Sequence, residues 1–382
     1  MHDIPAFAQM QNALFPFMGS TLFALLHFYI YKALLKSLST KPAPRLLWKL
    51  FSLLNALACI AYLFLRNIPT PQVLYFLLSL ALGVCYLLTL AALLYQLCSL
   101  FILPLKSKSA RSRWRHRSKL GVFAITLCIF ALGIYNGAQA PHIVRVNVEL
   151  EALSAPLKVA VLSDIHIGGL MERHKVSEIV ALTNELGADM IFLVGDIVDA
   201  RLSDVEGAVD ELGKLRAREG VFYVLGNHEY FHDIEHILDK MRALGFRVLL
   251  NQSYTNENLN IVGLADFMGW RVGKLEPNLA KALEHINPSL PTILLAHQPK
   301  VISLFSPNEP IDLVISGHTH GGQMFPLSLA MRLQQPFISG LHTLSNLHQS
   351  KVYVSQGAGF WGPPMRLGSQ REITLITLTP PH

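Results

Sequence analysis

The chain has 382 residues, of which 51% are hydrophobic and only 15% are charged, a composition too apolar for an ordinary soluble protein of this length. Its charge is divided unevenly: up to Ala140 there are 13 Lys and Arg against one acid, Asp3, giving +12, whereas the rest has 19 basic and 25 acidic residues, giving −6. The second part shows no basic groove with interleaved aromatic residues, so nucleic acid is excluded as an expected partner. It also contains no cysteine, which excludes a disulfide framework or a Cys-rich zinc site there.

Four apolar stretches occupy the first part of the chain, at about Leu14–Leu35, Leu46–Leu65, Val73–Leu105 and Leu120–Gly137. Each reaches the roughly 20 residues that cross a bilayer, which predicts four transmembrane helices within a region 1–140. His27 lies inside the first stretch, where an ionisable residue is a functional candidate by default. A neutral His packed between helices fits equally well, and the sequence assigns it no role.

Basic residues between the stretches predict the orientation. The first and third loops are basic, with Lys36, Lys41, Arg45 and Lys49 in the first and seven Lys and Arg from Lys106 to Lys119 in the third; the second loop has only Arg66. Positive loops face the cytoplasm, so the region after Ala140 is expected outside the cytoplasmic (inner) membrane. Binding of anionic lipid is the alternative role of the third loop. A cleavage site at Ala138-Gln-Ala140 is conceivable, but its apolar segment would follow three other spans, which favours an uncleaved helix.

From about Val144, strands and helices alternate. Apolar runs predict strands at Leu157–Leu162, Met190–Val194, Val221–Leu225, Arg247–Leu250, Leu259–Leu264, Ile293–Leu295, Leu313–Ile315, Lys351–Ser355 and Glu372–Leu378. Helical periodicity predicts helices at Glu172–Leu186, at Ser203–Arg218 with Ser203 as a possible cap, at Phe231–Leu244 and at Lys274–His285. Asn251–Asn258 is rich in turn residues. This order predicts two sheets with helices outside, in a second domain at 141–382.

Five short motifs stand at the ends of these strands: Ser-Asp-Ile-His at 163–166, Gly-Asp-Ile-Val-Asp at 195–199, Gly-Asn-His-Glu at 226–229, Ala-His-Gln-Pro at 296–299 and Gly-His-Thr-His-Gly at 317–321. Strand ends are where an α/β sheet builds its sites. Carboxylate, imidazole and amide oxygen together suit borderline divalent metals. The candidate ligands are Asp164, His166, Asp196, Asn227, His297, His318 and His320.

The spacing of these ligands suggests a two-metal centre. Asp164 and His166 are two residues apart, so in an extended segment both side chains reach the same side. His318 and His320 have the same spacing, roughly 7 Å along a strand, which suits one His on each of two ions about 3.5–4 Å apart. Asp196 has two oxygens and can bridge both ions. Such ions lower the pKa of a bridging water and stabilise charge on a phosphoryl group.

His228 directly follows Asn227 and is therefore not expected to bind the same metal. It is the candidate general acid that protonates the leaving oxygen. The alternative is a structural His that only orients a neighbour.

These motifs resemble the calcineurin-like metallophosphoesterase superfamily over about residues 155–380, with every element in order. The resemblance implies a four-layer α/β/β/α sandwich, here preceded by an all-α bundle of four transmembrane helices. It also implies two divalent ions, manganese first and iron or zinc as alternatives. It assigns the first ion to Asp164, His166, Asp196 and His320, and the second to Asp196, Asn227, His297 and His318.

Gly-His-Thr-His-Gly-Gly-Gln at 317–323 and the segment 356–366 are similar to those of membrane-associated bacterial members, including UDP-2,3-diacylglucosamine hydrolases of lipid A synthesis. The expected protein is a membrane-anchored phosphoesterase acting on a phosphodiester, pyrophosphate or phosphomonoester. Four spans are more than an anchor requires, which suggests membrane lipids as partners and a lipid-linked substrate. The alternatives are a cytoplasm-facing UDP-2,3-diacylglucosamine pyrophosphatase and a catalytically inactive membrane interaction protein.

Two basic residues lie nearest the motifs, Arg201 and Arg366, and each either holds a substrate phosphate or forms a surface salt bridge. Phe325–His348 reads as an insertion that caps the site, rests on the bilayer or simply covers the core. Trp361 fits a packed aromatic better than a stacking platform.

Overall fold

A computed structural model describes residues 6–39, 41–101, 107–344 and 350–381. The chain divides into two compact units by its internal contacts. The helical unit comprises Met1–Ala138 and Gly362–Met365, and the sheet unit comprises Gln139–Trp361 and Arg366–His382. Of the predicted features, Lys106, the end of the third apolar stretch at 102–105 and the end of the insertion at 345–348 lie outside the described residues.

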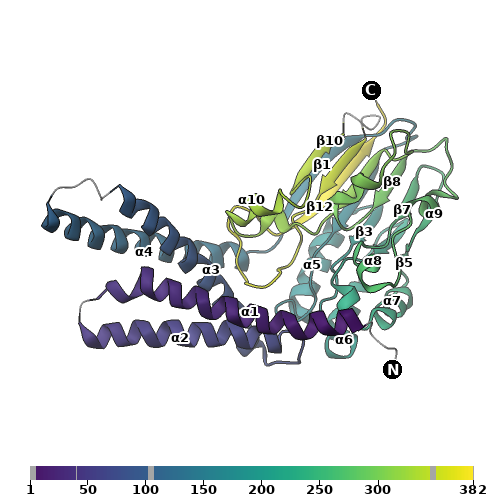
Figure 1. Cartoon of the computed structure of the whole chain (residues 1–382). Helices are drawn as coiled ribbons and strands as arrows, with labels where there is room; N and C mark the ends of the chain where they lie inside the picture. The colour runs from purple at the N-terminus through teal and green to yellow at the C-terminus, as the bar shows by residue number, and fades with distance from the viewer. Residues whose placement is uncertain (1–5, 40, 102–106, 345–349, 382) are drawn as a thin grey trace. The chain divides into compact units, whose positions relative to one another are not determined.

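Four long helices build the helical unit: α1 (Ala6–Ala33), α2 (Pro42–Leu65), α3 (Gln72–Leu100) and α4 (Lys108–Ala138), with the short η1 (Leu35–Ser37) between the first two (Figure 1). All four are long and apolar enough to cross a membrane. Large apolar side chains such as Phe17, Leu47 and Leu54 are about two-thirds exposed on their outer faces. Bare apolar surface of this extent fits lipid and not water as the surrounding medium. The prediction of four apolar helices before the sheets is confirmed.

Small side chains lie where these helices meet. Ala81, Cys85 and Ala92 of α3 are buried together with Cys59 of α2 and Ile30 of α1 in one core. Small residues let helix backbones approach closely, which replaces the hydrophobic driving force that lipid does not provide.

The basic segment before the fourth span is helical. Lys108–Lys119 was expected in a loop, and this was wrong: the segment forms the first three turns of α4. It contains neither Gly nor Pro, and Lys and Arg are good helix formers, so nothing in it stops the helix. Their long side chains keep the charged groups in water while the helix continues into the apolar part.

Two six-stranded sheets form the sheet unit (Figure 1). The first has the order β1 (His142–Glu149), β12 (Glu372–Thr379), β2 (Leu157–Leu162), β3 (Met190–Val194), β4 (Gly220–Val224), β5 (Arg247–Val248). The second has the order β10 (Gly340–Thr343), β11 (Lys351–Val354), β9 (Leu313–Ser316), β8 (Thr292–Leu295), β7 (Asn260–Gly263), β6 (Gln252–Thr255). β2 to β5 run parallel, as do β7, β8, β9 and β11, so their carboxyl ends share one edge in each sheet.

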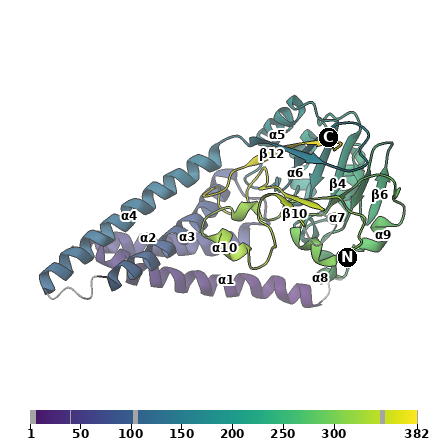
Figure 2. The same ribbon diagram turned by 90° about the horizontal axis from the view of Figure 1, so that it is seen from above.

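The core lies between the two sheets. Inward-facing side chains of both sheets form one buried cluster that includes Val159, Phe192, Phe222, Ile261, Ile293 and Leu313. Helices α5 (Arg173–Glu185), α6 (Leu202–Leu212) and α7 (Ile234–Ala243) flank the first sheet (Figure 2). On the far face of the second sheet, Leu279 of α9 (Leu279–Leu283) and Val301 of η3 (Pro299–Leu304) pack against its strands. This is the predicted four-layer α/β/β/α sandwich.

The predicted helix at Lys274–His285 was wrong over its first half. α8 (Met268–Val272) ends at Gly273, whose φ of 67° is left-handed, and α9 begins only at Leu279. Pro277 disfavours helical backbone at the residue before it, and the side chain of Asn278 caps α9 by accepting a hydrogen bond from the Lys281 N–H.

Other boundaries also differ from the prediction. The helix predicted at Phe231–Leu244 begins only at Ile234, after a short 3-10 turn, η2 (Glu229–Phe231). α6 starts at Leu202 and ends at Leu212, so Ser203 is not its cap and 214–218 is not helical. The turn-rich segment at 251–258 contains β6, and its four residues pair with β7 across a short turn. The insertion holds the short helix α10 (Leu327–Met331) and strand β10, which pairs with β11 at the edge of the second sheet.

Candidate metal centre

All eight polar residues singled out in the motifs lie in loops that directly follow strands of the two sheets. Asp164 and His166 follow β2, Asp196 follows β3, and Asn227 and His228 follow β4 in the first sheet; His297 follows β8, and His318 and His320 follow β9 in the second sheet. Because these strands are parallel within each sheet, the structure brings the loops together.

Unusual backbone conformations mark this centre. Asp164, His166, Asp196, His318 and His320 have φ values of 52°, 53°, 51°, 71° and 50°. The expectation that Asp164/His166 and His318/His320 lie in extended segments was therefore wrong. Left-handed backbone costs a residue other than glycine about 1–3 kcal/mol and persists at sites whose surroundings fix it. Here the chain turns sharply at the end of each strand.

Asp164, His166 and His320 form the first group of possible ligands. One ligand atom of each lies within 4.8 Å of the others, and all three side chains are buried. His320 Nε2 is 3.4 Å from Asp164 Oδ1 and 3.1 Å from His166 Nε2. Two imidazole nitrogens and a carboxylate oxygen that converge in this way can hold one divalent ion.

Asp196, His297 and His318 form the second group, again within 4.8 Å. The Asp196 carboxylate lies between the two groups, because its Oδ2 is 3.1 Å from His297 Nε2 and 3.9 Å from His166 Nε2. His318 belongs to the second group and His320 to the first, so each of the two histidines faces a different group. Asp196 is thus placed to bridge two ions.

One buried atom points to a cation at this centre. Asn227 Oδ1 has no hydrogen-bond partner among the described residues. A buried acceptor without a partner costs about 1–3 kcal/mol. His297 Nδ1 donates to the Val194 carbonyl at 2.9 Å, and its Nε2 lies 3.1 Å from Asp196 Oδ2. Burial alone would lower the pKa of His297, but Asp196 raises it well above its usual value, so a metal ion would replace a proton shared by these two side chains.

His318 and His320 are held in the neutral form. Burial and the nearby His297 lower the pKa of His318 to about 3, and burial together with His166 lowers the pKa of His320 well below its usual value. Burial alone would raise the pKa of Asp196, but the surrounding imidazoles of His297 and His228 lower it well below its usual value. His318, His320 and Asp196 are therefore in the neutral and ionised forms that bind metal, whereas burial raises the pKa of Asp164.

Glu229 fixes the loop that carries Asp196. Its buried carboxylate accepts hydrogen bonds from the backbone N–H groups of Ile197 (2.7 Å), Asp196 (3.2 Å) and Gly226 (3.0 Å). This role was missed from the sequence. The only signal was an acid placed directly after Asn227-His228 in a strand-end loop.

Asp199 orients the candidate general acid. Its Oδ1 is 2.7 Å from His228 Nδ1 and 3.2 Å from His232 Nε2, and its Oδ2 is 3.3 Å from His166 Nδ1. Burial lowers the pKa of His228, but the Asp199 and Asp196 carboxylates outweigh it and raise that pKa to about 9. The sequence analysis quoted Asp199 within a motif without a role; the acid three residues after Asp196 was its signal.

Close backbone packing requires two of the motif glycines. A Cβ on Gly226 would overlap the backbone nitrogen and Oδ1 of Asp196, and a Cβ on Gly317 would overlap the Ser163 hydroxyl and Asp164 Oδ2. The loops of the two sheets therefore touch where the ligands sit.

The two arginines named from the sequence lie in different surroundings. Arg201 is exposed at the residue before α6, two positions after Asp199. Arg366 is fully buried, and its guanidinium donates to the carbonyl oxygens of His320 (2.8 Å), Gln356 (2.9 Å) and Gly359 (2.8 Å). These bonds favour a positioning role for Arg366, holding the His320 loop, over contact with substrate.

Two exposed aromatic rings flank His228. The ring centroids of Phe231 and Trp361 lie 6.0 and 6.4 Å from that of His228, and each side chain is 51% exposed. The Gln323 side chain bonds the Trp361 backbone at both its N–H and its carbonyl. Trp361 is thus half-exposed beside the candidate acid and not a packed core aromatic.

Comparison with known proteins agrees with this geometry. The family model described as calcineurin-like phosphoesterase matches residues 157–322. The chain is 35% identical to an uncharacterised metallophosphoesterase of Helicobacter pylori (strain ATCC 700392 / 26695), over 93% of this chain and 96% of the relative. It is 35% identical to a transmembrane protein with metallophosphoesterase domain of Danio rerio, over 66% of this chain and 61% of that protein.

A third relative is phosphodiesterase YaeI of Escherichia coli (strain K12), 30% identical over 59% of this chain and 83% of its own. The match to the Helicobacter protein spans nearly the full length of both chains and therefore includes the helical unit. The chain belongs to the calcineurin-like metallophosphoesterase family.

Proposed function

We propose that the sheet unit is a two-metal phosphoesterase that hydrolyses a phosphodiester, with a pyrophosphate or phosphomonoester as the other possible substrates. The observation that carries the proposal is the convergence of buried nitrogen and oxygen ligands in two groups, with the unpartnered buried Asn227 Oδ1 predicted as a further ligand. An inactive interaction protein would not need to keep such an atom unsatisfied.

Two overlapping ligand sets would hold the ions: Asp164, His166, Asp196 and His320 for one, and Asp196, Asn227, His297 and His318 for the other. Manganese is the first choice, and iron or zinc fit the same donors. When bound, two divalent ions lower the pKa of water and offset the charge that develops on a phosphoryl group.

His228 is the proposed general acid. Asp199 accepts from Nδ1, which leaves Nε2 as the nitrogen that carries a proton toward the ligand cluster, 4.0 Å from Asp196 Oδ2. A protonated imidazole there can give its proton to the leaving oxygen of the substrate. If His228 were purely structural, its replacement would slow substrates with good and with poor leaving groups by the same factor.

An amphiphilic phosphodiester is the proposed substrate class. The relative from Escherichia coli is named a phosphodiesterase. Phe231 and Trp361 give the site an apolar margin, and Phe325, Leu329 and Leu333 of the insertion are 59%, 57% and 88% exposed. Together with four spans, these surfaces suit a phospholipid or a lipid-linked envelope intermediate.

The proposed location is the cytoplasmic (inner) membrane, with the sheet unit on its outer side. The support is the distribution of basic residues, because basic segments next to membrane spans face the cytoplasm. Lys41, Arg45 and Lys49 lie at the start of α2, and the Lys108–Lys119 segment starts α4. The connection from α2 to α3 has only Arg66.

Substrate class is tested with the full chain in detergent, loaded with manganese. We expect faster turnover of a long-chain phosphodiester lipid than of a short-chain analogue with the same head group. Leu329→Ser with Leu333→Ser should reduce this preference and leave hydrolysis of the short-chain analogue unchanged. Equal turnover of both substrates would remove the lipid proposal and leave the phosphoesterase proposal standing.

Orientation is tested with reporters fused to the C-terminus, one active only outside the cytoplasm and one only inside. An outside signal is expected. An inside signal would overturn the proposed location and make a UDP-2,3-diacylglucosamine-type pyrophosphatase the better assignment, with a nucleotide and a lipid monophosphate as products.

A further inference from the structure

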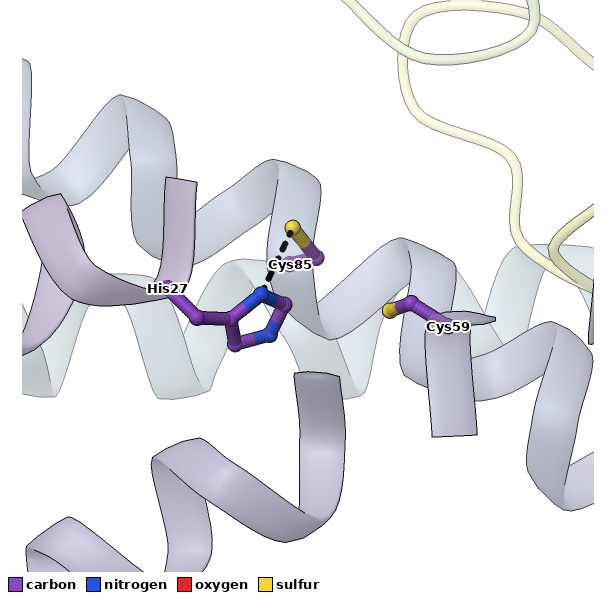
Figure 3. A group of neighbouring side chains, drawn as sticks. All are labelled: His27, Cys59 and Cys85. Carbon is purple, nitrogen blue, oxygen red and sulfur yellow. Dashed lines mark hydrogen bonds between the residues drawn. The ribbon is translucent and has the colours of Figure 1, made fainter. Parts of the chain in front are cut away.

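A second group of metal-binding side chains lies within the helical unit. His27 of α1, Cys59 of α2 and Cys85 of α3 come from three different helices and converge (Figure 3). One ligand atom of each lies within 4.8 Å of the others, and their exposed fractions are 4%, 0% and 2%. Cys85 Sγ is 3.9 Å from His27 Nδ1.

These distances are close to those of a tetrahedral site. With metal–sulfur bonds of about 2.3 Å and a metal–nitrogen bond of about 2.0–2.1 Å, neighbouring ligand atoms lie roughly 3.5–3.8 Å apart. The Cys85–His27 pair is already near this spacing. The widest separation in the group has to shorten by about 1 Å, which side-chain rotation can supply.

Hydrogen bonds hold the imidazole in place. His27 Nδ1 lies 2.7 Å from the Phe23 carbonyl one turn earlier, and Asn55 Nδ2 donates to His27 Nε2 at 2.9 Å. Asn55 also reaches the Ala81 carbonyl at 3.2 Å and Cys59 Sγ at 3.9 Å. Asn55 thus ties the three helices together around the group.

The side chains around this group indicate the charge of the ion that it can bind. Up to Ala140 the sequence has one acid, Asp3, so no carboxylate is available to share this site within the spans. An unbalanced charge is costly among apolar helices. Two thiolates and a neutral imidazole offset the charge of a divalent cation, whereas with copper(I) they leave one negative charge. Thiolate and imidazole without carboxylate are ligands for zinc.

We propose that His27, Cys59 and Cys85 bind one zinc(II) ion that fastens α1, α2 and α3 to one another. Binding takes a hydrated zinc(II) ion from solution, forms two zinc–sulfur bonds and one zinc–nitrogen bond, releases the two thiol protons, and leaves one water of the ion in the fourth position. Coordination by Nδ1 opens the bond to Phe23 and moves the ring proton to Nε2, beside Asn55. Asn55 then has to present its oxygen to that proton.

The site differs in donor chemistry from the centre of the sheet unit, which permits a clean test. All four cysteines of the chain lie before Ala140, so a sulfur ligand to any metal reports the helical unit alone. The full chain in detergent, reduced and then freed of reductant, is loaded with cobalt(II) or zinc(II). We expect a thiolate-to-cobalt charge-transfer absorption and, with zinc, sulfur scattering at about 2.3 Å in X-ray absorption.

Cys59→Ser, Cys85→Ser and His27→Gln should each lose one zinc equivalent per chain, and the two cysteine variants should lose the absorption band or most of it. Cys98→Ser and Cys128→Ser are the matched controls, because these cysteines lie on α3 and α4 outside the group; both should keep the band. Variants that do not fold would leave the wild-type absorption measurements as the deciding test.

Absence of sulfur scattering in the zinc-loaded wild-type chain would overturn the proposal. So would a Cys59–Cys85 disulfide that forms in the purified chain while its reduced form takes up no zinc. A band that survives in both cysteine variants, or copper(I) as the ion that binds in preference, would contradict the zinc assignment. None of these outcomes depends on phosphoesterase activity.

Discussion

The helical and sheet units place their buried polar groups in opposite ways. In the sheet unit, carboxylates, imidazoles and an amide crowd one edge of two sheets, and five of them are in left-handed backbone. In the helical unit, the group His27, Cys59 and Cys85 sits among apolar side chains without a carboxylate. The sheet unit therefore suits borderline divalent ions held by nitrogen and oxygen, and the helical unit suits an ion held mainly by sulfur.

Replacement of Asp196 should have the largest effect on metal binding and activity, because this residue lies between both ligand groups. We expect Asp196→Asn to reduce phosphodiester hydrolysis to the background of the assay and to lower bound manganese below two ions per chain. The matched control is Asp204→Asn, an exposed acid at the start of α6. Retention of two ions and of activity in Asp196→Asn would contradict the bridging role.

Replacing His228 tests proton donation separately from metal binding. We expect His228→Gln to reduce kcat by about 10²–10⁴-fold, the usual contribution of a general acid, while manganese content stays the same. The loss should shrink for a nitrophenyl ester, whose leaving oxygen needs no proton. His236→Gln, an exposed histidine on α7, serves as the control. A loss that is independent of the leaving group would favour a structural role for His228.

Asp199 acts through His228, so its effect should be smaller and should appear in the pH profile. The acid must be protonated, so activity falls as the pH rises through its pKa. Asp199 helps to raise the pKa of His228 to about 9. In Asp199→Asn that support is lost, so the alkaline fall should move to lower pH by about 1 unit or more, with kcat/KM reduced about 10–100-fold. An unchanged alkaline limb would argue against this pairing.

Replacing Gly226 tests how tightly the loops pack beneath the site, and the measured quantity is the stability of the protein. A side chain there would overlap Asp196, so Gly226→Ala should lower the stability of the sheet unit by about 1–3 kcal/mol. Gly207 on α6 has open space around its Cβ position, so Gly207→Ala should be neutral or stabilise by up to about 1 kcal/mol. Thermal unfolding of both full-length variants provides the comparison; equal shifts would show that the loop contact is not tight.

The smallest effect is expected where the two units are independent. His27→Gln should leave hydrolysis of a short-chain phosphodiester within roughly twofold of wild type, because its cluster contains no ligand of the sheet unit. A loss of tenfold or more, which is about 1.4 kcal/mol in the barrier, would show that the helical unit acts on the active site.

Sequence patterns predicted best where one physical signal dominates. Continuous apolar runs located β2 and β3 to the residue, and long apolar stretches located the four helices of the helical unit. Motifs at strand ends indicated which side chains the fold brings together, because parallel strands share their carboxyl edge.

Contacts between residues far apart in the sequence could not be predicted from such local patterns. β6 forms from turn-rich residues only because β7 offers a partner, and β10 forms at the edge of β11 for the same reason. Asp and His tolerate left-handed backbone better than most residues, but the surrounding loops decide that Asp164 and His318 adopt it. The sequence suggests that Arg366 is a substrate ligand or a surface cation. Its guanidinium instead binds the carbonyls of Gln356 and Gly359 nearby in the chain and of His320 in a distant loop.

The roles of Glu229 and Asp199 depend on hydrogen-bond partners about thirty residues away. The convergence of His27, Cys59 and Cys85 depends on the register of three helices. The sequence shows where these residues stand but not which partners they meet.

Removal and return of metal tests the central claim most directly. The measurement uses the full-length His27→Gln chain, so that only the sheet unit is loaded, and follows phosphodiester hydrolysis together with the number of bound ions. The account predicts that chelation abolishes activity and that two manganese ions per chain restore it. Full activity after complete removal of metal, or restoration by a single ion, would contradict it.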